Sequence, residues 1–210
     1  MNDLTAAFNI KIKNAKEITS LQMAYGLNIL IMGSWNISEI ILIQLFENIK
    51  KIEEKQISKL EGHKKGISCL KYFEPKSILI SGGFDCQIFL WNLEKKMKII
   101  QFTAHTHYIC SIQIESNGEF FYTISRDNTI KEWNTKTGQL SEEFSKYFSN
   151  TCDYSFTLTP CEKFIAASNF KKNYKVDMFN IMTKKIFCDF DDFKKGQEIK
   201  AEAQKIKNKR

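Results

Sequence analysis

The chain has 210 residues and a net charge of +7, and 43% of its residues are hydrophobic with only two prolines. This composition excludes an intrinsically disordered chain and is enough for a substantial core. The longest apolar stretch, around residues 40–45, is far shorter than the ~20 residues that cross a bilayer, and the start shows no signal-peptide pattern.

The first predicted strands are short segments with a period near two or short apolar runs, as buried strands have. They occupy residues 18–25, 28–33, 39–45 and 55–60. A further run at residues 8–13 could be the closing strand of a still earlier unit. The chain therefore begins with the strand rhythm of a four-stranded unit.

The next two units are related by an internal repeat. A shift of 42 residues superimposes polar and aromatic residues without a gap: His63 on His105, Ser81 on Thr123, Asp85 on Asp127 and Trp91 on Trp133. These residue types would rarely recur at one constant spacing by chance. In the clearer unit, strands are expected at residues 66–73, 77–82, 87–92 and 96–102, with turn-forming residues between them. Four short strands ended by a tryptophan are typical of a propeller blade.

A fourth unit follows with a weaker pattern. Strand rhythm continues over residues 152–160, 163–170, 174–181 and 185–189. Phe179 takes the tryptophan's place there, 46 residues after Trp133 instead of 42. In the first unit Ile43 takes the same place. The sequence thus predicts about four units, two regular and two degenerate.

Residues 60–135 resemble WD40 repeats. The Gly-His pair of that family appears as Gly62-His63 and, altered, as Ala104-His105, and its Trp-Asp end appears as Trp91-Asn92 and Trp133-Asn134. The resemblance implies an all-β, WD40-type β-propeller of about four blades. We expect the blades over residues 5–190, the best-matching repeats at 60–95 and 102–137, and a charged basic tail with a short helix at 191–210.

The number of blades raises a question of closure. WD40 propellers are usually closed rings of about seven blades, and closure removes exposed sheet edges. Four blades would make a partial or open ring with two open flanks. The chain could be a fragment or a divergent product, could self-associate, or could have its ring completed by a partner, and the sequence leaves these alternatives open.

The repeated polar residues admit two interpretations. A hydroxyl, an imidazole and a carboxylate suggest a hydrolase triad, yet the set occurs twice and each copy ends in a tryptophan. In the family that the repeats resemble, these residue types form an internal hydrogen-bond network that stabilises the fold. The resemblance therefore implies two structural tetrads and no catalytic residue. The tetrads are His63, Ser81, Asp85 and Trp91, and His105, Thr123, Asp127 and Trp133.

Candidate contact residues lie in the loops by which partners commonly dock on propellers that resemble this one. They are Lys64, Lys65, Phe84, Arg126 and His107, with Cys86, Thr106 and Asn128 in the same loops. Phe84 is the strongest candidate because aromatic side chains dominate the energetics of protein interfaces. The alternative is that Phe84 merely packs over its own blade.

No motif indicates a cofactor or a metal. The six cysteines include no C-x-x-C pair, and His107 has no further ligands at suitable spacing. Phosphate-binding and common hydrolase motifs are also missing from the sequence. We therefore expect no cofactor, free thiols, no membrane contact and an intracellular location, cytoplasmic or nuclear.

Two functions remain after these exclusions. The leading one is a non-catalytic scaffold that binds one or more proteins within a multiprotein complex. The alternative is a propeller associated with RNA or ribonucleoprotein through residues 194–210, which hold seven basic and two acidic side chains. That tail lacks aromatic residues, so its contact with RNA or an acidic surface would be weak and salt-sensitive.

Overall fold

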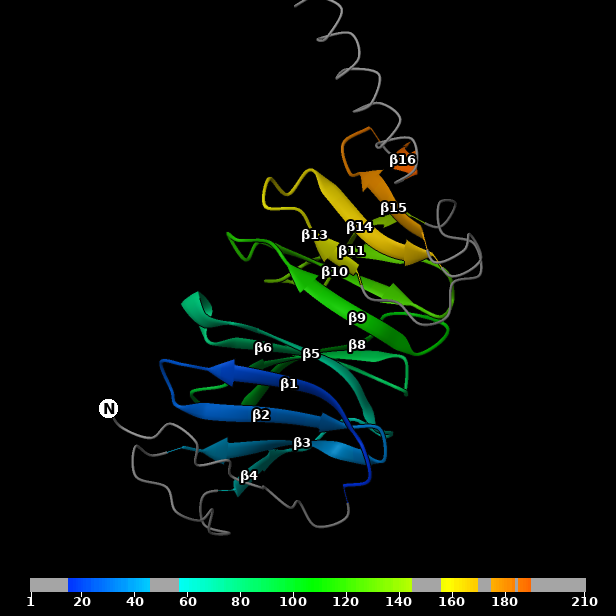
Figure 1. The fold of residues 1–210 in the computed structure, drawn as a ribbon. Helices are drawn as coiled ribbons and strands as arrows, with labels where there is room; N and C mark the ends of the chain where they lie inside the picture. Colours follow the sequence, from blue (N-terminus) through cyan, green and yellow to red (C-terminus); the bar gives the residue numbers. More distant parts are fainter. Residues whose placement is uncertain (1–14, 46–56, 145–155, 170–174, 184, 190–210) are drawn as a thin grey trace, which may run out of the picture. The chain divides into compact units, whose positions relative to one another are not determined.

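The structure is a computed structural model that describes residues 15–45, 57–144, 156–169, 175–183 and 185–189. Over these residues it contains sixteen strands and one 3-10 turn, η2 (Glu74–Lys76). The strands form four antiparallel sheets, and each sheet consists of four strands that are consecutive in the sequence (Figure 1). The predicted all-β class and the predicted number of units are confirmed.

The first two sheets precede residue 104. The first sheet consists of β1 (Ile18–Ala24), β2 (Ile29–Ser34), β3 (Ile37–Gln44) and β4 (Ile57–Leu60). The second sheet consists of β5 (Ile67–Phe73), β6 (Ile78–Gly83), β7 (Gln87–Asn92) and β8 (Met97–Thr103). Every predicted strand of these two units is present, with ends that differ by one or two residues.

The other two sheets follow the same plan. The third sheet consists of β9 (Ile109–Ile114), β10 (Phe120–Ser125), β11 (Ile130–Asn134) and β12 (Leu140–Phe144). The fourth sheet consists of β13 (Phe156–Leu158), β14 (Phe164–Asn169), β15 (Lys175–Asn180) and β16 (Lys185–Asp189). The strand expected at 8–13 and the helix expected near the C-terminus lie outside the described residues.

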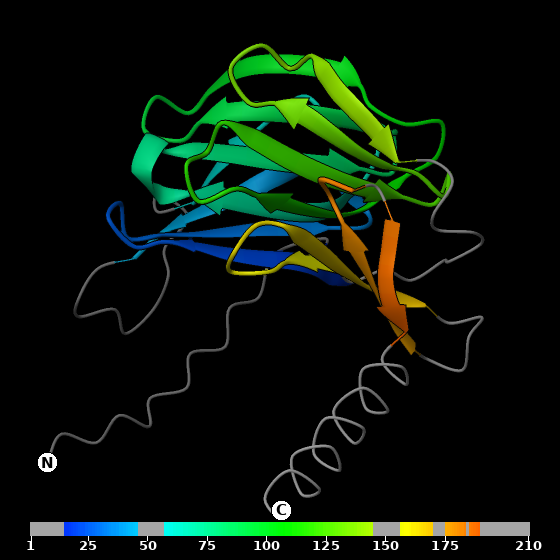
Figure 2. The ribbon, with the colours of Figure 1, turned by 90° about the horizontal axis from the view of Figure 1, so that it is seen from above.

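The chain divides into two compact parts, Met1–Ile112 and Gln113–Arg210, which are described separately. In the N-terminal part, β1 and β2 pack against β5, so that the first sheet lies beside the second (Figure 2). The two sheets share one cluster of buried side chains, which includes Ile31 and Leu42 from the first and Leu79 and Phe89 from the second. Each fully buried side chain of this size contributes about 1.5–3 kcal/mol. Burial between these two sheets therefore stabilises this part of the chain.

Glycines of the second strand in the first and second sheets allow a neighbouring isoleucine to approach. A Cβ on Gly33 would lie 2.7 Å from Cγ2 of Ile67, which is fully buried. A Cβ on Gly82 would lie 2.9 Å from Cγ2 of Ile109. Because no side chain fits in either place, the isoleucine that begins one sheet fills a hole in the sheet before it.

Polar side chains join the innermost strands of neighbouring sheets. The side chains of Ser20 and Gln22 accept hydrogen bonds from the backbone N–H groups of Leu70 and Tyr72, at 3.1 and 3.4 Å. In the C-terminal part, Nε2 of Gln113 donates to the carbonyl of Phe156 at 2.9 Å. Backbone groups that no strand pairing satisfies thus find partners in the next sheet.

A glutamate in the turn between the first two strands of a sheet accepts hydrogen bonds from the corresponding turn of the preceding sheet. The carboxylate of Glu74 accepts hydrogen bonds from the N–H groups of Tyr25 and Gly26, at 3.2 and 2.6 Å. In the C-terminal part, Glu162 accepts a bond from the N–H group of Ser116 in the same way. The same contact therefore occurs once in each part of the chain.

Cross-strand register confirms which residues occupy the tryptophan position. In each sheet the position lies opposite an apolar residue of the second strand: Leu30 opposite Ile43, Leu79 opposite Trp91, Phe121 opposite Trp133 and Ile165 opposite Phe179. All four residues at this position are buried. The first and last sheets therefore keep the geometry of the repeat without its tryptophan.

None of the described helical segments is long and apolar enough to cross a membrane.

Candidate functional site

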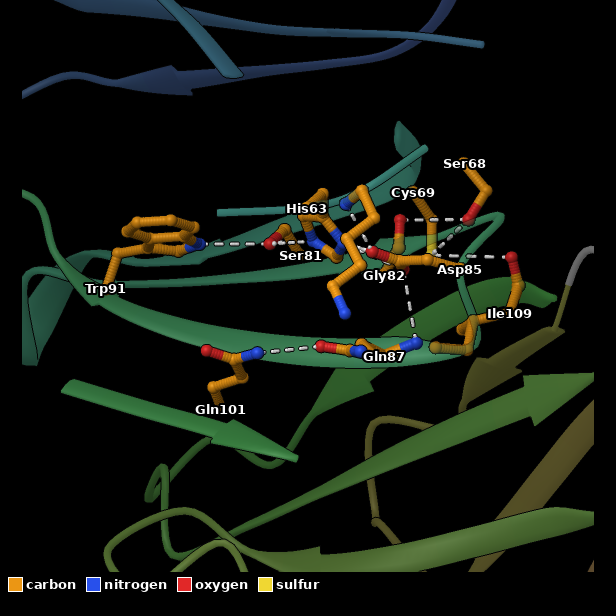
Figure 3. A network of polar contacts seen from close by, with 11 residues as sticks. His63, Ser68, Cys69, Ser81, Gly82, Asp85, Gln87, Trp91, Gln101 and Ile109 are labelled. Carbon is orange, nitrogen blue, oxygen red and sulfur yellow. Dashed lines mark hydrogen bonds and ion pairs between the residues drawn. The ribbon is translucent and has the colours of Figure 1, made fainter. Parts of the chain in front are cut away.

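The first predicted tetrad is joined in series by hydrogen bonds (Figure 3). The indole N–H of Trp91 donates to Oγ of Ser81 at 2.9 Å. Oγ of Ser81 lies 2.9 Å from Nε2 of His63, and Nδ1 of His63 lies 2.9 Å from Oδ1 of Asp85. The network thus connects β6 and β7 with two loops of the second sheet. These are the loop before β5 and the loop between β6 and β7.

One arrangement of protons satisfies all four groups. The indole N–H of Trp91 can only donate, so the Ser81 oxygen accepts from it and its own hydrogen remains available for Nε2 of His63. Nε2 is then the unprotonated nitrogen, and Nδ1–H donates to the carboxylate of Asp85. The neutral Nδ1–H tautomer of His63 therefore satisfies every donor and acceptor in the series.

Asp85 also receives two backbone hydrogen bonds. The N–H of Lys64 donates to Oδ2 at 2.8 Å, and the N–H of Gln87 donates to Oδ1 at 3.2 Å. Burial acts to raise the pKa of Asp85, but the hydrogen bonds from His63 and from these two N–H groups outweigh it and hold the pKa below its ordinary value. Asp85 is therefore ionised and holds the loop that carries Lys64.

The second tetrad shows part of the same pattern. The indole N–H of Trp133 donates to Oγ1 of Thr123 at 2.8 Å, and both Thr123 and His105 are buried. Oδ1 of Asp127 accepts from the backbone N–H and the hydroxyl of Thr129, at 3.0 and 2.7 Å. Asp127 therefore closes its own turn between β10 and β11.

The geometry of the first tetrad does not suit nucleophilic catalysis. Ser81 has no accessible surface, and the side chain of His63 is also fully buried. A substrate carbonyl would have to approach the hydroxyl to about 3 Å, which the surrounding side chains prevent. The stabilising role that the resemblance implies for the tetrad stays a prediction.

Three loops at one end of the second sheet are joined through their backbones. The N–H of Phe84 donates to the carbonyl of Gly66 at 2.9 Å, and the N–H of Ala104 donates to the carbonyl of Cys86 at 3.0 Å. These bonds bring the loop before β5, the loop between β6 and β7 and the loop before β9 together. We call the side chains that they present the loop surface: Lys64, Lys65, Phe84, His107 and Tyr108.

Aromatic rings form the centre of the loop surface. The ring of Phe84 lies 5.1 Å from that of Tyr108, and His107 stands edge-on to Tyr108 at 4.9 Å. Phe84 and Tyr108 are half-buried, whereas Lys64 and Lys65 are exposed. Phe84 therefore packs against the neighbouring loop and still presents part of its ring to solvent. Sequence reasoning overlooked Tyr108, although it directly follows His107 in a loop that was already a candidate.

Arg126 lies in the other part of the chain. It is exposed in the turn between β10 and β11, next to Asp127, and Asn128 has a positive φ of 67° in the same turn. Because the two parts are described separately, Arg126 is not assigned to the loop surface. Its contribution to partner binding remains a prediction from the sequence.

A second polar group in the C-terminal part was not foreseen. The hydroxyl of Tyr122 lies 2.6 Å from Oε1 of Glu132 and 3.1 Å from Oε1 of Glu115. A single hydroxyl hydrogen can serve only one carboxylate at a time. Burial, and then the nearby charges of Glu162 and Glu132, raise the pKa of Glu115. No sequence motif marks this group, since its members come from β10, from β11 and from the turn that follows β9.

Cys69 and Cys161 form no disulfide, and none of the cysteines that the structure describes belongs to a group of metal ligands. Sγ of Cys69 is buried 3.8 Å from Oγ of Ser68 and 3.9 Å from the carbonyl of Ile109 (Figure 3). Burial raises the pKa of the Cys69 thiol to about 12, so this group is unreactive. Among the described residues, no three histidines, cysteines or carboxylates are grouped as metal ligands.

Comparison with known families identifies the repeats. The family described as "WD domain, G-beta repeat" matches residues 54–92 and 96–134. The first match contains the complete tetrad described above, and the second ends at Asn134, directly after Trp133. The resemblance inferred from the Gly-His and Trp-Asn pairs is confirmed.

Two kinds of curated relatives share this region. DDB1- and CUL4-associated factor 13 of Gallus gallus is 31% identical over 88 residues, which cover 41% of this chain and 20% of that protein. Pre-mRNA-processing factor 17 of Homo sapiens is 28% identical over 133 residues, which cover 60% of this chain and 22% of that protein. The chain spans about a fifth of the length of these relatives.

A solved structure shares the fold. The crystal structure of the WD40 beta propeller domain of Doa1 superimposes with a TM-score of 0.66 and 16% sequence identity. The match covers 82% of this chain and 54% of that one. At this level of identity the likeness shows the fold alone, and it agrees with the four sheets described above.

Proposed function

This chain carries two WD40 repeats and has the fold of a WD40 β-propeller, and on that premise we propose that it is a non-catalytic scaffold that binds other proteins within a multiprotein complex. The proposed propeller region is residues 5–190, and the proposed location is inside the cell. The names of the curated relatives, a DDB1- and CUL4-associated factor and a pre-mRNA-processing factor, support a role in macromolecular complexes.

The observation that carries the proposal is the loop surface. It presents partly exposed aromatic rings beside two exposed lysines, and aromatic side chains are enriched where proteins bind one another. The surface is also rigid at its base, because Asp85 binds both His63 and the backbone of Lys64. A preorganised surface loses little conformational entropy when a partner binds.

The proposal is tested by partner capture with a matched pair of variants. Phe84→Ala removes the centre of the loop surface, and Tyr25→Ala removes an aromatic side chain that is 76% exposed on the turn between β1 and β2. We expect proteins retained by the wild-type chain, identified by mass spectrometry, to be lost from Phe84→Ala and kept by Tyr25→Ala. Equal retention by both variants would contradict the assignment of the surface.

The same experiment separates the scaffold from the RNA-binding alternative. Nuclease treatment removes RNA, and deletion of residues 194–210 removes seven basic side chains. A protein scaffold keeps its partners after both treatments. If binding disappears with either one, contact with RNA through the tail explains the interaction better, because lysines bind phosphates by releasing counterions.

A further inference from the structure

Trp35 is a large aromatic residue that no sequence pattern singled out. It is 45% exposed in the turn between β2 and β3. In each of the first two sheets, the last residue of the second strand pairs with the first residue of the first strand, across a register shift. Trp35 and Phe84 each follow that last residue directly, so they hold the same position in successive sheets.

Gly66 contacts both the turn that carries Trp35 and the turn that carries Phe84. A Cβ on Gly66 would overlap the carbonyl oxygen of Trp35, so the two backbones touch directly. The carbonyl of Gly66 accepts a hydrogen bond from the N–H of Phe84 at 2.9 Å. Since Lys64 and Lys65 directly precede Gly66, the loop before β5 places two lysines beside both aromatic turns.

The turn that carries Trp35 is held by hydrogen bonds near its base. Oδ1 of Asn36 accepts from the backbone N–H of Lys16 at 3.0 Å. A little further along, the hydroxyl of Thr19 donates to the carbonyl of Ile67, the first residue of β5, at 2.5 Å. Trp35 is therefore presented to a partner on an ordered backbone, which lowers the entropy cost of binding. We call the loop surface together with Trp35 the extended loop surface.

The exposed charge next to the aromatic turns is positive. Lys64 and Lys65 are both exposed. The carboxylate of Asp85 belongs to the same loops, but its side chain is only 4% exposed, and its oxygens accept hydrogen bonds from His63 and two backbone N–H groups. The exposed Glu61 lies at the far end of the loop before β5, directly after β4. This arrangement favours a partner that brings negative charge to the lysines.

The aromatic rings of this surface suit apolar side chains better than nucleic-acid bases. A base stacks on an open ring face. The ring of Phe84 instead packs against Tyr108 with its plane tilted by 43°, and His107 stands edge-on to Tyr108. Phe84 and Tyr108 are also half-buried. Partly covered rings of this kind receive apolar side chains at protein interfaces, which favours a peptide over RNA.

We propose that the extended loop surface binds an extended, acidic segment of the partner protein. Apolar side chains of that segment pack on Trp35 and Phe84, and its carboxylates pair with the two lysines between them. Because sheets that pack face to face lie about 10 Å apart, the two aromatic positions are separated by about three residues of extended chain. This inference rests on the proposed scaffold function and names the kind of partner that its surface receives.

The first test selects ligands for the full chain from a phage-displayed library of random short peptides. We expect the retained peptides to combine aspartate or glutamate with apolar residues about three positions apart. Fluorescence anisotropy with one retained peptide then measures its affinity. The charge-reversed variant, Lys64→Glu with Lys65→Glu, and the variant Trp35→Ala should each weaken binding by about tenfold or more.

Two matched controls change the opposite ends of the same sheets. Lys95→Glu with Lys96→Glu reverses two exposed lysines in the turn between β7 and β8, and Tyr25→Ala removes an exposed aromatic side chain between β1 and β2. Successive turns of an antiparallel sheet alternate between its ends, so neither turn belongs to the extended loop surface. Both controls should bind the peptide as the wild type does. Equal weakening by the controls would overturn the proposal.

An exchange of charges gives a test that a folding defect cannot imitate. A copy of the retained peptide with lysines in place of its acidic residues should bind the charge-reversed variant more tightly than it binds the wild type. The proposal falls if this preference is absent or if the selection yields no acidic peptides. It also falls if a single-stranded oligouridine binds the wild-type chain more tightly than the retained peptide does.

Partner capture separates the failure of this inference from the failure of the proposed function. Partners that are lost from Phe84→Ala but kept by the charge-reversed variant and by Trp35→Ala would leave the scaffold intact and overturn the acidic ligand. Equal retention by Phe84→Ala and Tyr25→Ala would contradict the binding surface itself. Loss from all three loop variants, with retention by both controls, is the result that we expect.

Discussion

Ser81 is the residue on which the polar network of the second sheet depends. Its oxygen accepts the indole N–H of Trp91 and its hydrogen serves Nε2 of His63, so Ser81 joins the tryptophan to the rest of the tetrad. An apolar residue in its place would leave the indole and the imidazole with unsatisfied groups. The equivalent position of the first sheet, Met32, avoids this cost because Ile43 opposite Leu30 carries no donor.

The carboxylate of Asp85 should be important for stability. Asp85→Ala leaves the buried Nδ1–H of His63 and the N–H of Lys64 without an acceptor, and we expect the free energy of unfolding to fall by about 2–4 kcal/mol. Urea unfolding measures the loss, with the exposed Glu119→Ala as control. An unchanged unfolding curve together with loss of a bound partner would show that Asp85 acts in binding instead.

The lowered pKa of Asp85 also predicts a dependence on pH. A carboxyl whose pKa is lower in the folded chain contributes stability that is complete above its ordinary pKa of about 3.9 and is lost as the pH falls through the folded value. We therefore expect the stability difference between the wild type and Asp85→Asn to be largest near neutral pH and to shrink below about pH 4. Urea unfolding at several pH values checks this, and a constant difference would contradict it.

At the scale of elements, an isoleucine of one sheet packs into the space left by a glycine of the neighbouring sheet. Gly33→Ala would place a Cβ 2.7 Å from Cγ2 of Ile67. We expect a loss of about 1–3 kcal/mol from overpacking, measured as a lower midpoint of urea unfolding. In the background of Ile67→Ala the same change should cost much less, since the clashing methyl group is gone. Additive losses would argue against a direct contact.

Strands were more predictable from the sequence than the contacts between sheets. Alternation of apolar residues and turn residues such as those around Pro75 were enough to place the described strands of the first, second and fourth sheets within a few residues. No local sequence pattern indicates that Ile67 packs over Gly33, because this contact depends on the register between segments that are distant in the sequence. The tetrad of His63 was predictable because its members recur, whereas the group around Tyr122 occurs once and was missed.

At the scale of the whole molecule, the loop surface lies at the ends of the strands of the second sheet. Because the chain spans about a fifth of its curated relatives, their complete activities do not transfer to it.

The order of the strands has a consequence for synthesis. Each described sheet uses four consecutive strands, and no strand is exchanged between distant parts of the chain. A sheet can therefore form as soon as its own last strand has left the ribosome, without waiting for later sequence. Each newly emerged sheet then offers an apolar side to the one that follows, so we expect the sheets to form in their order along the chain.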